Sequence, residues 1–526
     1  MELKREESMN EVGHKPYGAP DEGYSGPRRA LILSGGGMRV AYEAGAIRAL
    51  VESGLRFAHA DGTSGGGINL AMLFSGLSPV EMCDRWRTLN VHDFVHLMPF
   101  ETYLKAYDML AMGTADGVRN QVFPHLGIDV PAINAARGML GTFNVCNYTR
   151  KTNEVITHDT IDLDLLIAGV SLPIFLPPVP KNGYLYMDSL WIKNANLMEA
   201  VKRGAEELWL IWCVGNTGEY KTGAFNQYVH MIELSANGKL FDELEYISEL
   251  NSRIARGEEA YGQTRPIKLH VIKPFYPLLL DPDLYFGRID TATLIDMGYA
   301  DAMRYLVGMH DEGLPFSPEV TKMQDDKAGI AFHETMSGPF ALGETDPQVG
   351  AEKGKAAGTT LSITCAINIH DLDRFIADPD HYGDIIGQVS FTPFEENMPA
   401  KSGVFNLFSP TDDPTLKLMV YELAFAHNGQ DYYLAGRKEV RTGPVYDLWR
   451  DTTTLYTTLH QGTDRSGPIV GAGIVTIDMG AFTKMVSSMR VTSAHSITDE
   501  AGTLFHFGRF FLGELWDTYG PGAKSQ

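Results

Sequence analysis

The chain has 526 residues, which is enough for two or three domains with sizeable buried cores. Its 44% hydrophobic and 21% charged residues are typical of a globular protein, and no stretch approaches the roughly 18 apolar residues needed to span a bilayer. With 66 acidic and 44 basic residues the formal net charge is −22, which argues against nucleic acid as a partner and against polybasic docking on anionic lipid.

Residues 1–27 are rich in charge, Gly and Pro and contain no apolar segment, so they predict a disordered arm and not a signal peptide. The four cysteines lie far apart, with no CxxC pair and no His/Cys spacing typical of a metal site. We interpret them as reduced, packed thiols of a cytoplasmic protein, and we expect no metal and no cofactor. These cysteines are Cys83, Cys146, Cys213 and Cys365.

From residue 28 onward, short apolar runs alternate with helical patterns. Residues 30–33 predict a buried strand that stops at Ser34 and three glycines, and residues 40–51 carry apolar residues at helical spacing. A second strand is predicted at 55–60 and a helix at 68–76, and Ser78 begins a further helix with a capping box. Buried strands follow at 207–215 and 266–274, with helical stretches between them. This alternation predicts an α/β sheet covered on both faces.

The pattern changes after about residue 310. Residues 311–355 are rich in turn formers and predict an interdomain stretch. Residues 356–526 contain short β-prone runs separated by turn signals, with one or two helices. Asn428-Gly429 is a strong hairpin signal because the pair suits a type I′ turn. We expect an antiparallel β-rich (α+β) C-terminal domain here.

Ser64 lies in the sequence GTSGG at residues 62–66, between a predicted strand and a predicted helix. Gly62, Ser64 and Gly66 match the G-x-S-x-G pattern of a nucleophile elbow, and a helix N-terminus behind Ser64 would favour developing negative charge. The alternative is an ordinary Gly/Ser turn, because this pattern often arises by chance.

A second glycine-rich turn, SGGGMR, precedes the first predicted helix. Gly35, Gly36 and Gly37 would expose consecutive backbone N–H groups, which an acyl-transfer enzyme needs for its oxyanion. A phosphate cradle is the alternative. Val40 occupies the position of the last glycine of a dinucleotide fingerprint, and no Gly-Lys-Ser/Thr follows, so the oxyanion interpretation fits better.

A general base must complete this site. Enzymes with a Ser-His-Asp triad on an α/β-hydrolase sheet have several strands before the nucleophile, whereas Ser64 follows the second predicted strand. None of the 16 histidines stands in a turn that marks it out. The β-prone run 183–187 instead delivers Asp188 to a strand end, where catalytic residues of α/β folds lie.

These residues resemble the patatin-like phospholipases, lipid acyl hydrolases with a Ser-Asp dyad. Three motifs occur in the family's order: GGGMR at 35–39, the GTSGG elbow, and Asp188 after PIFLPPV at 173–179. Asn194 matches the family's asparagine, and residues 295–306 resemble its closing helix, so the resemblance covers residues 28–310. It implies a patatin-like three-layer sandwich with a mostly parallel sheet, and a lipid acyl ester as the substrate.

The resemblance implies that Ser64 is the nucleophile, that Asp188 is its base, and that Gly35, Gly36 and Gly37 form the oxyanion hole. Arg39 would support that loop, although a surface arginine is an equal alternative. The sequence departs from the family at two places: Val40 replaces a glycine, and Asp-Gly-Gly/Ala is Asp188-Ser189-Leu190. The second departure affects the turn beside the base, because serine lacks the conformational freedom of glycine.

Two other functions stay open at this point. One is a carboxylesterase with a Ser-His-Asp triad. The other is a lipid-binding protein whose dyad is impaired by Ser189 and Leu190.

The C-terminal half resembles, more weakly, a β-rich module appended to some cholesterol-oxidase-like GMC oxidoreductases. This resemblance implies contact with a lipid surface or a lipid-bound partner, and the alternative is a structural cover for the catalytic domain. Residues 449–451 (Trp-Arg-Asp) and His460 are either a site or, as burial preferences favour, core and turn residues. The oligomeric state is left open.

Overall fold

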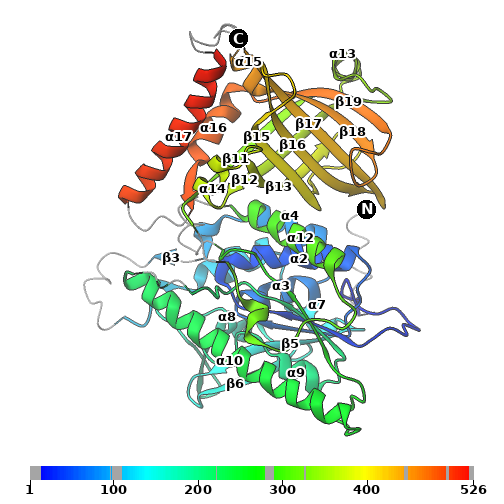
Figure 1. Ribbon diagram of the computed structural model, residues 1–526. Coiled ribbons are helices and arrows are strands. Elements are labelled where there is room, and N and C mark those ends of the chain that lie inside the picture. The colour runs from blue at the N-terminus through cyan, green and yellow to red at the C-terminus, as the bar shows by residue number, and fades with distance from the viewer. Residues whose placement is uncertain are drawn as a thin grey trace. The chain divides into compact units, whose positions relative to one another are not determined.

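The computed structural model describes residues 13–94, 96–97, 109–218, 220, 222–278, 290–324, 327–442, 448–492 and 497–519. The chain divides into two compact units, residues 1–325 and 326–526, which we call unit 1 and unit 2. Figure 1 draws unit 1 from blue to green and unit 2 from yellow-green to red. None of the described helices is both long and apolar enough to cross a bilayer.

Unit 1 is built on a sheet that has eight strands within the described residues. Five neighbouring strands are parallel, and the strands beyond β5 run antiparallel. Along the sheet the order is β10 (Lys268–Ile272), β9 (Glu207–Ile211), β1 (Arg29–Leu33), β2 (His59–Thr63), β5 (Leu140–Asn147), β8 (Tyr184–Asp188) and β7 (Val179–Lys181), while β6 (Thr152–Thr157) also pairs with β5.

Helices cover both faces of this sheet, because alternate residues of its strands enter different cores. Leu31 and Leu33 of β1 lie in one core with α2, α3, α4 and α12, whereas Ala30 and Ile32 lie in another with α9 and α10. The result is the predicted α/β class with three layers. The helices of unit 1 are η1 (Gly37–Val40), α2 (Ala41–Glu52), α3 (Gly65–Phe74), α4 (Pro79–Thr88), η2 (Val91–Asp93), η4 (Val118–Val122), α6 (Phe123–His125), α7 (Val130–Ala135), α8 (Leu163–Gly169), α9 (Leu197–Lys202), α10 (Ala224–Ala255), α12 (Thr291–Gly308) and η5 (Pro318–Thr321), and a short ribbon is formed by β3 (His96–Leu97) and β4 (Gly113–Thr114).

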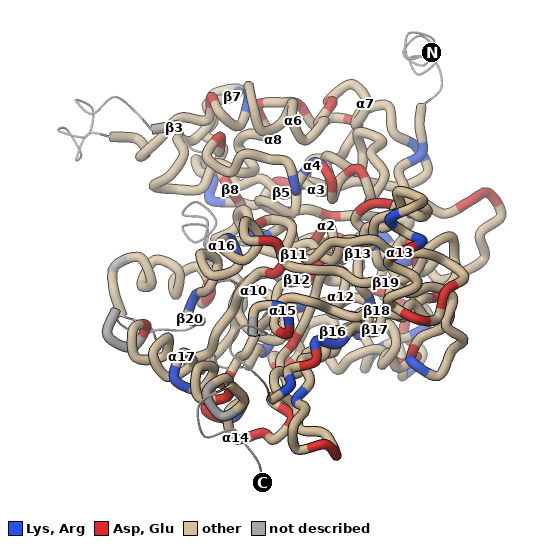
Figure 2. Tube along the Cα trace, turned by 90° about the horizontal axis from the view of Figure 1, so that it is seen from above, with Lys and Arg blue, Asp and Glu red and all other residues tan. Residues whose placement is uncertain are grey.

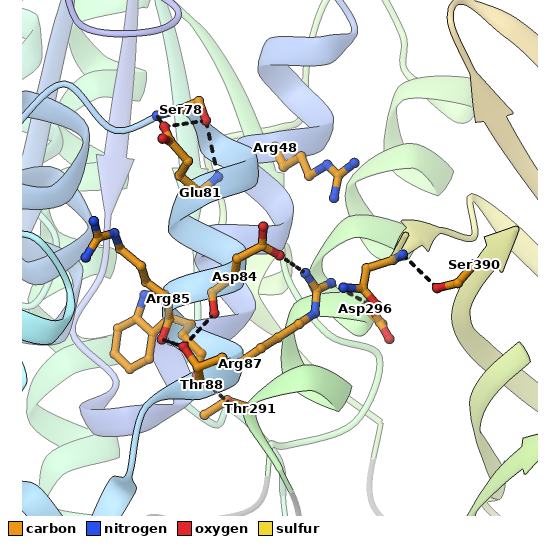
Figure 3. Close-up of polar contacts among 12 residues, drawn as sticks. Arg48, Ser78, Glu81, Asp84, Arg85, Arg87, Thr88, Thr291, Asp296 and Ser390 are labelled. Atoms are coloured by element: carbon orange, nitrogen blue, oxygen red, sulfur yellow. Dashed lines mark hydrogen bonds and ion pairs between the residues drawn. The ribbon is translucent and has the colours of Figure 1, made fainter. Parts of the chain in front are cut away.

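The predicted capping box at the start of α4 is present. Ser78 Oγ accepts a hydrogen bond from the Glu81 N–H, and the Glu81 carboxylate accepts one from the Ser78 N–H. At the other end of α4, Arg87 forms an ion pair with Asp296 of α12 at 3.3 Å (Figure 3). Burial raises the pKa of Asp296 to about 7, although Arg87 lowers it. This pair ties the closing helix α12 to the core that carries the elbow.

Two expectations for unit 1 differ from the structure. The second strand begins at His59, because residues before it are used for the turn after α2, in which Gly54 has a φ of +85°. The predicted arm 1–27 has residues 1–12 outside the described residues, and its remainder is bound to unit 1. The His14 carbonyl accepts from the Arg137 N–H at 2.9 Å, and the Gly18 carbonyl accepts from the Phe57 N–H at 2.8 Å.

Unit 2 is an antiparallel sheet of ten strands within the described residues, which closes on itself because β12 pairs with both β11 and β13. Its elements confirm the expected antiparallel β-rich class. The strands are β11 (Gly329–Leu342), β12 (Thr360–Ile369), β13 (Tyr382–Phe391), β14 (Met398–Pro399), β15 (Ser402–Pro410), β16 (Leu416–His427), β17 (Gln430–Arg441), β18 (Thr454–Gln461), β19 (Ile469–Thr476) and β20 (Arg490–Thr492), and the helices are α13 (Pro347–Ala357), α14 (Leu372–Ala377), α15 (Leu448–Thr453), α16 (Met479–Ser488) and α17 (Ile497–Tyr519).

The hairpin signal between β16 and β17 is confirmed, since Asn428 and Gly429 have φ values of +49° and +74°. The interdomain stretch 311–355 differs from the expectation, because β11 and most of α13 lie in it. Several of its glycines serve close packing. A Cβ on Gly338 would lie 2.2 Å from the Ile474 carbonyl oxygen, and one on Gly354 would lie 2.4 Å from the Phe340 nitrogen.

Candidate active site

Ser64 stands at the corner between β2 and α3. Its φ of +53° is unusual for a residue other than glycine, and the neighbouring glycines allow it. A Cβ on Gly66 would lie 2.5 Å from the Leu33 carbonyl oxygen, and one on Gly65 would lie 2.5 Å from the Gly37 carbonyl oxygen. The first turn of α3 therefore lies directly against the end of β1 and the glycine-rich loop, with Ser64 at its N-terminus.

Asp188, the last residue of β8, meets this corner. Ser64 Oγ donates a hydrogen bond to Asp188 Oδ2 at 2.6 Å, and the Leu190 N–H donates to Asp188 Oδ1 at 2.8 Å. The two residues are 7% and 2% exposed. Burial raises the pKa of Asp188 to about 7, outweighing the hydrogen bonds from Ser64 and Leu190, which lower it. This carboxylate is therefore a stronger base than a solvated aspartate.

The glycine-rich loop lies beside Ser64. A Cβ on Gly35 would be 2.9 Å from the Ser64 Cβ and 2.3 Å from Asn194 Oδ1, so a side chain at this position would displace the nucleophile. The Gly35 N–H already donates to the Asn194 carbonyl at 3.1 Å. Within the described residues, the N–H groups of Gly36 and Gly37 make no hydrogen bond. Of the three predicted donors, these two are unoccupied.

Arg39 is buried and its Nε donates to the Gly36 carbonyl at 3.0 Å. Arg39 is therefore not a surface arginine, and its guanidinium contacts the glycine-rich loop. Val40, where the family has glycine, is fully buried, and its side chain packs beside Gly36 and Gly65. At this position the valine side chain fills space in the core beside the loop.

Residues 31–201 match the family model described as "Patatin-like phospholipase". The chain carries a patatin-like phospholipase domain. Among solved structures, the crystal structure of VipD from Legionella pneumophila matches with 13% identity and a TM-score of 0.29, over 57% of this chain and 72% of that chain. The comparison with curated proteins finds no match. The family match supports lipid acyl hydrolase activity for the patatin-like domain.

A largely buried polar network, which sequence reasoning missed, connects the two sides of the patatin-like site. Ser189 Oγ donates to Asn153 Oδ1 at 2.5 Å, and Asn153 Nδ2 donates to Asn144 Oδ1 at 2.8 Å. Asn144 Nδ2 then donates to Asp61 Oδ1 at 2.7 Å. Asn196 Nδ2 also donates to Asn144 Oδ1, at 2.8 Å. The network runs from β2, just before the elbow, to the residue after Asp188.

This network accounts for the departure at Ser189. Among the described residues Ser189 is not one of those with positive φ, so the turn does not use the conformational freedom of glycine. Its hydroxyl is fixed by Asn153 instead. The available sequence signal was weak: polar residues inside a buried strand, such as Asn144 in β5.

A narrow apolar hollow with a free volume of about 10 Å³ adjoins Ser64 in the patatin-like domain. Its walls come from α3, β5 and α8, with Phe123 beside them. The apolar side chains that line it are Ile68, Ala71, Phe123, Phe143, Val145, Leu165, Leu166 and Val170.

Other candidate residues do not join this site. In the part of the chain that the structure describes, no histidine is hydrogen-bonded to Ser64 or Asp188. No group of three or more His, Cys, Asp or Glu side chains among the described residues is arranged to hold a metal ion. In unit 2, Asp451 accepts a hydrogen bond from Tyr519 at 2.9 Å, and His460 bonds the Gly467 carbonyl, so these residues hold turns and strands together.

Proposed function

We propose that the patatin-like domain is a serine acyl hydrolase, a carboxylic ester hydrolase of lipids that works with Ser64 as nucleophile and Asp188 as base. The observation that carries the proposal is the 2.6 Å hydrogen bond from Ser64 Oγ to Asp188 Oδ2 at a strained elbow. The family match supports the reaction class, and the dyad and the substrate are our proposal.

In the first half of the reaction, Ser64 Oγ attacks the carbonyl carbon of the ester while Asp188 accepts the hydroxyl proton. The N–H groups of Gly36 and Gly37 donate to the oxyanion, and the N-terminus of α3 adds a favourable field. Collapse of the tetrahedral intermediate breaks the ester C–O bond. The proton passes from Asp188 to the leaving alcohol, and the acyl group stays on Ser64.

In the second half, water attacks the acyl-enzyme and gives its proton to Asp188. The second tetrahedral intermediate releases the carboxylic acid, and the proton returns to Ser64 Oγ. The apolar hollow beside Ser64 supports a hydrocarbon acyl group, because its lining offers little to a polar one.

The proposal is tested with Ser64→Ala and Asp188→Asn against a soluble p-nitrophenyl ester and a mixed lipid extract. Both variants should lose turnover by at least about a thousandfold. Ser252→Ala on α10, whose hydroxyl bonds only its own helix, is the matched control. A fluorophosphonate probe should label wild type at Ser64. Retention of most activity by Asp188→Asn would reject the dyad in favour of a histidine triad, and absence of wild-type turnover with intact lipid binding would indicate a binding protein.

A further inference from the structure

Unit 1 exposes a group of large apolar side chains near the candidate site. Leu110 is 79% exposed and Ile174 is 53% exposed, and Met112, Phe225 and Met231 are also exposed. We call these five residues the Ile174 surface. Exposed apolar residues that gather in this way mark interaction sites, whereas single ones need no explanation.

Hydrogen bonds and a ring contact connect the segments that carry this surface. The Met112 N–H donates to the Ile174 carbonyl at 2.7 Å, which joins the segment just before β4 to the loop after α8. On α10, the Tyr228 hydroxyl donates to the Pro173 carbonyl at 3.0 Å, and its ring lies 5.7 Å from the Phe175 ring. Phe225 and Met231 stand three residues before and after Tyr228, so they flank it on the helix. Figure 1 shows the start of α10 and the β3 segment on the same side of unit 1.

Ile174 is also strained. Its φ of +77° is a true outlier for a β-branched residue, and the side chain that this conformation presents is half exposed. Burial inside the protein therefore does not offset the strain. Strain of this kind concentrates at functional sites, which indicates that the apolar side chain acts on something outside the chain.

The Ile174 surface continues into the wall of the candidate site. The loop that carries Ile174 begins at Ser171, whose carbonyl accepts from the Asp188 N–H at 3.1 Å. Trp191, three residues after Asp188, has its ring 5.7 Å from that of Tyr228. A ligand held on this surface thus lies against the elements that hold the base.

The segments of the surface carry no ionic charge. Residues 109–115, 165–180 and 222–232 contain no Asp, Glu, Lys or Arg, although 21% of the chain is charged. Elsewhere, Figure 2 shows acidic and basic residues interspersed along the trace. The surface therefore suits insertion among hydrocarbon chains and not attraction to charged head groups.

We propose that the Ile174 surface docks unit 1 on a lipid surface made of zwitterionic or neutral lipids, with its apolar side chains inserted between the acyl chains. This inference rests on the proposed function, because a lipid acyl hydrolase must take its substrate from such a surface. It places the docking site on unit 1, beside the dyad.

The test measures binding of the full chain carrying Ser64→Ala to phosphatidylcholine vesicles by sedimentation, so that binding does not depend on turnover. Leu110→Ser and Ile174→Asn are introduced singly and together; asparagine tolerates positive φ, so the loop geometry is kept. Each change should weaken binding by about tenfold, since each removes one inserted side chain. Val307→Asn, at an 87% exposed position on α12 outside the surface, is the matched control and should bind like the parent.

Hydrolysis assays on soluble ester and on vesicles distinguish failure of the docking proposal from failure of the proposed function. In chains with Ser64 intact, the Leu110 and Ile174 variants should hydrolyse a soluble p-nitrophenyl ester at the parental rate while losing turnover on vesicles. Unchanged vesicle binding, or binding that disappears in high salt, would overturn the docking proposal. Variants that lose self-association or protein binding but keep vesicle binding would also overturn it. Absence of soluble-ester hydrolysis in the parent would instead reject the proposed function and leave the vesicle-binding result standing.

Discussion

The titration of Asp188 should control hydrolysis near neutral pH. Burial raises the pKa of this carboxyl group to about 7, and only its ionised form accepts the proton of Ser64. With such a pKa, about one molecule in a hundred is ionised at pH 5, whereas an ordinary aspartate with a pKa of about 3.9 is largely ionised there. The rate should therefore rise about 100-fold between pH 5 and pH 8.

The assay is kcat/KM for a soluble p-nitrophenyl ester from pH 5 to pH 9. A slope of about one below pH 7 and a plateau above it are expected. Burial also raises the pKa of Asp61 to about 8, so Asp61→Asn is the control for this second carboxyl group. This variant should keep the rise in rate near pH 7. An imidazole would give a similar limb, but its pKa falls with temperature while that of a carboxyl group hardly moves. A profile that is already flat at pH 5, or a limb that moves like an imidazole, would refute this role of Asp188.

The same pKa predicts a cost in stability. The pKa of Asp188 is higher in the folded state than in the unfolded state, so the folded chain binds this proton more tightly and protonation stabilises the fold. That stabilisation is fully present below about pH 4 and is lost as the pH rises through 7. The difference between about 7 and the ordinary 3.8 corresponds to about 4 kcal/mol at full burial. The asparagine introduced in Asp188→Asn does not ionise, so the variant does not lose this stabilisation. The free energy of unfolding of the variant minus that of wild type should therefore increase by up to about 4 kcal/mol between pH 4 and pH 8. The measurement is urea unfolding of both proteins at pH 4 and pH 8. The same difference in unfolding free energy at both pH values would contradict this prediction.

Three further outcomes follow from the site and the units. Ser189→Ala, which removes the bond to Asn153, should lower kcat by about 10- to 100-fold with KM and the unfolding midpoint nearly unchanged; a matching loss of stability would indicate a purely structural role. Arg39→Ala, which frees the Gly36 carbonyl, should lower kcat by about tenfold or more, and rates within twofold of wild type would contradict the bracing role. A chain ending at residue 325, the boundary between the units, should keep both soluble-ester and vesicle activity, because the Ile174 surface lies in unit 1. Loss of vesicle activity alone would place lipid targeting in unit 2, and an insoluble chain would make unit 2 a structural cover.

Local sequence patterns were enough to predict the central part of the site. The strand 30–33 runs directly into the glycine-rich loop, and the elbow is a second short motif at 62–66. Steric demands that glycine meets specify both turns. Asp188 needed an additional step, because its strand pairs with β5 and not with β2. The order of the motifs supplied that step, and the structure brings Asp188 within hydrogen-bond distance of Ser64.

The sequence was less informative where glycine serves packing and not a turn. Gly338, Gly350 and Gly354 suggested an interdomain stretch, yet they allow β11 and α13 to lie against β19 and each other. A glycine in a loop and a glycine at a close backbone contact look the same in one sequence. Only the position of the partner strand, more than 100 residues away in the case of Gly338, tells them apart.

The departure at Ser189 shows the same limit at the candidate site. Without its partners, a serine in place of the family's glycine suggests a turn that cannot form, and hence an impaired dyad. The turn instead avoids positive φ, and the serine hydroxyl is bonded to Asn153 and through Asn144 to Asp61 below the elbow. A side-chain network here performs the positioning that backbone freedom performs in the motif. Asn153 is only partly buried, so loss of the Ser189 hydroxyl costs little stability but removes the bond that fixes the residue next to Asp188. The residue that looked like damage to the motif is therefore the one whose removal should cost the site its alignment.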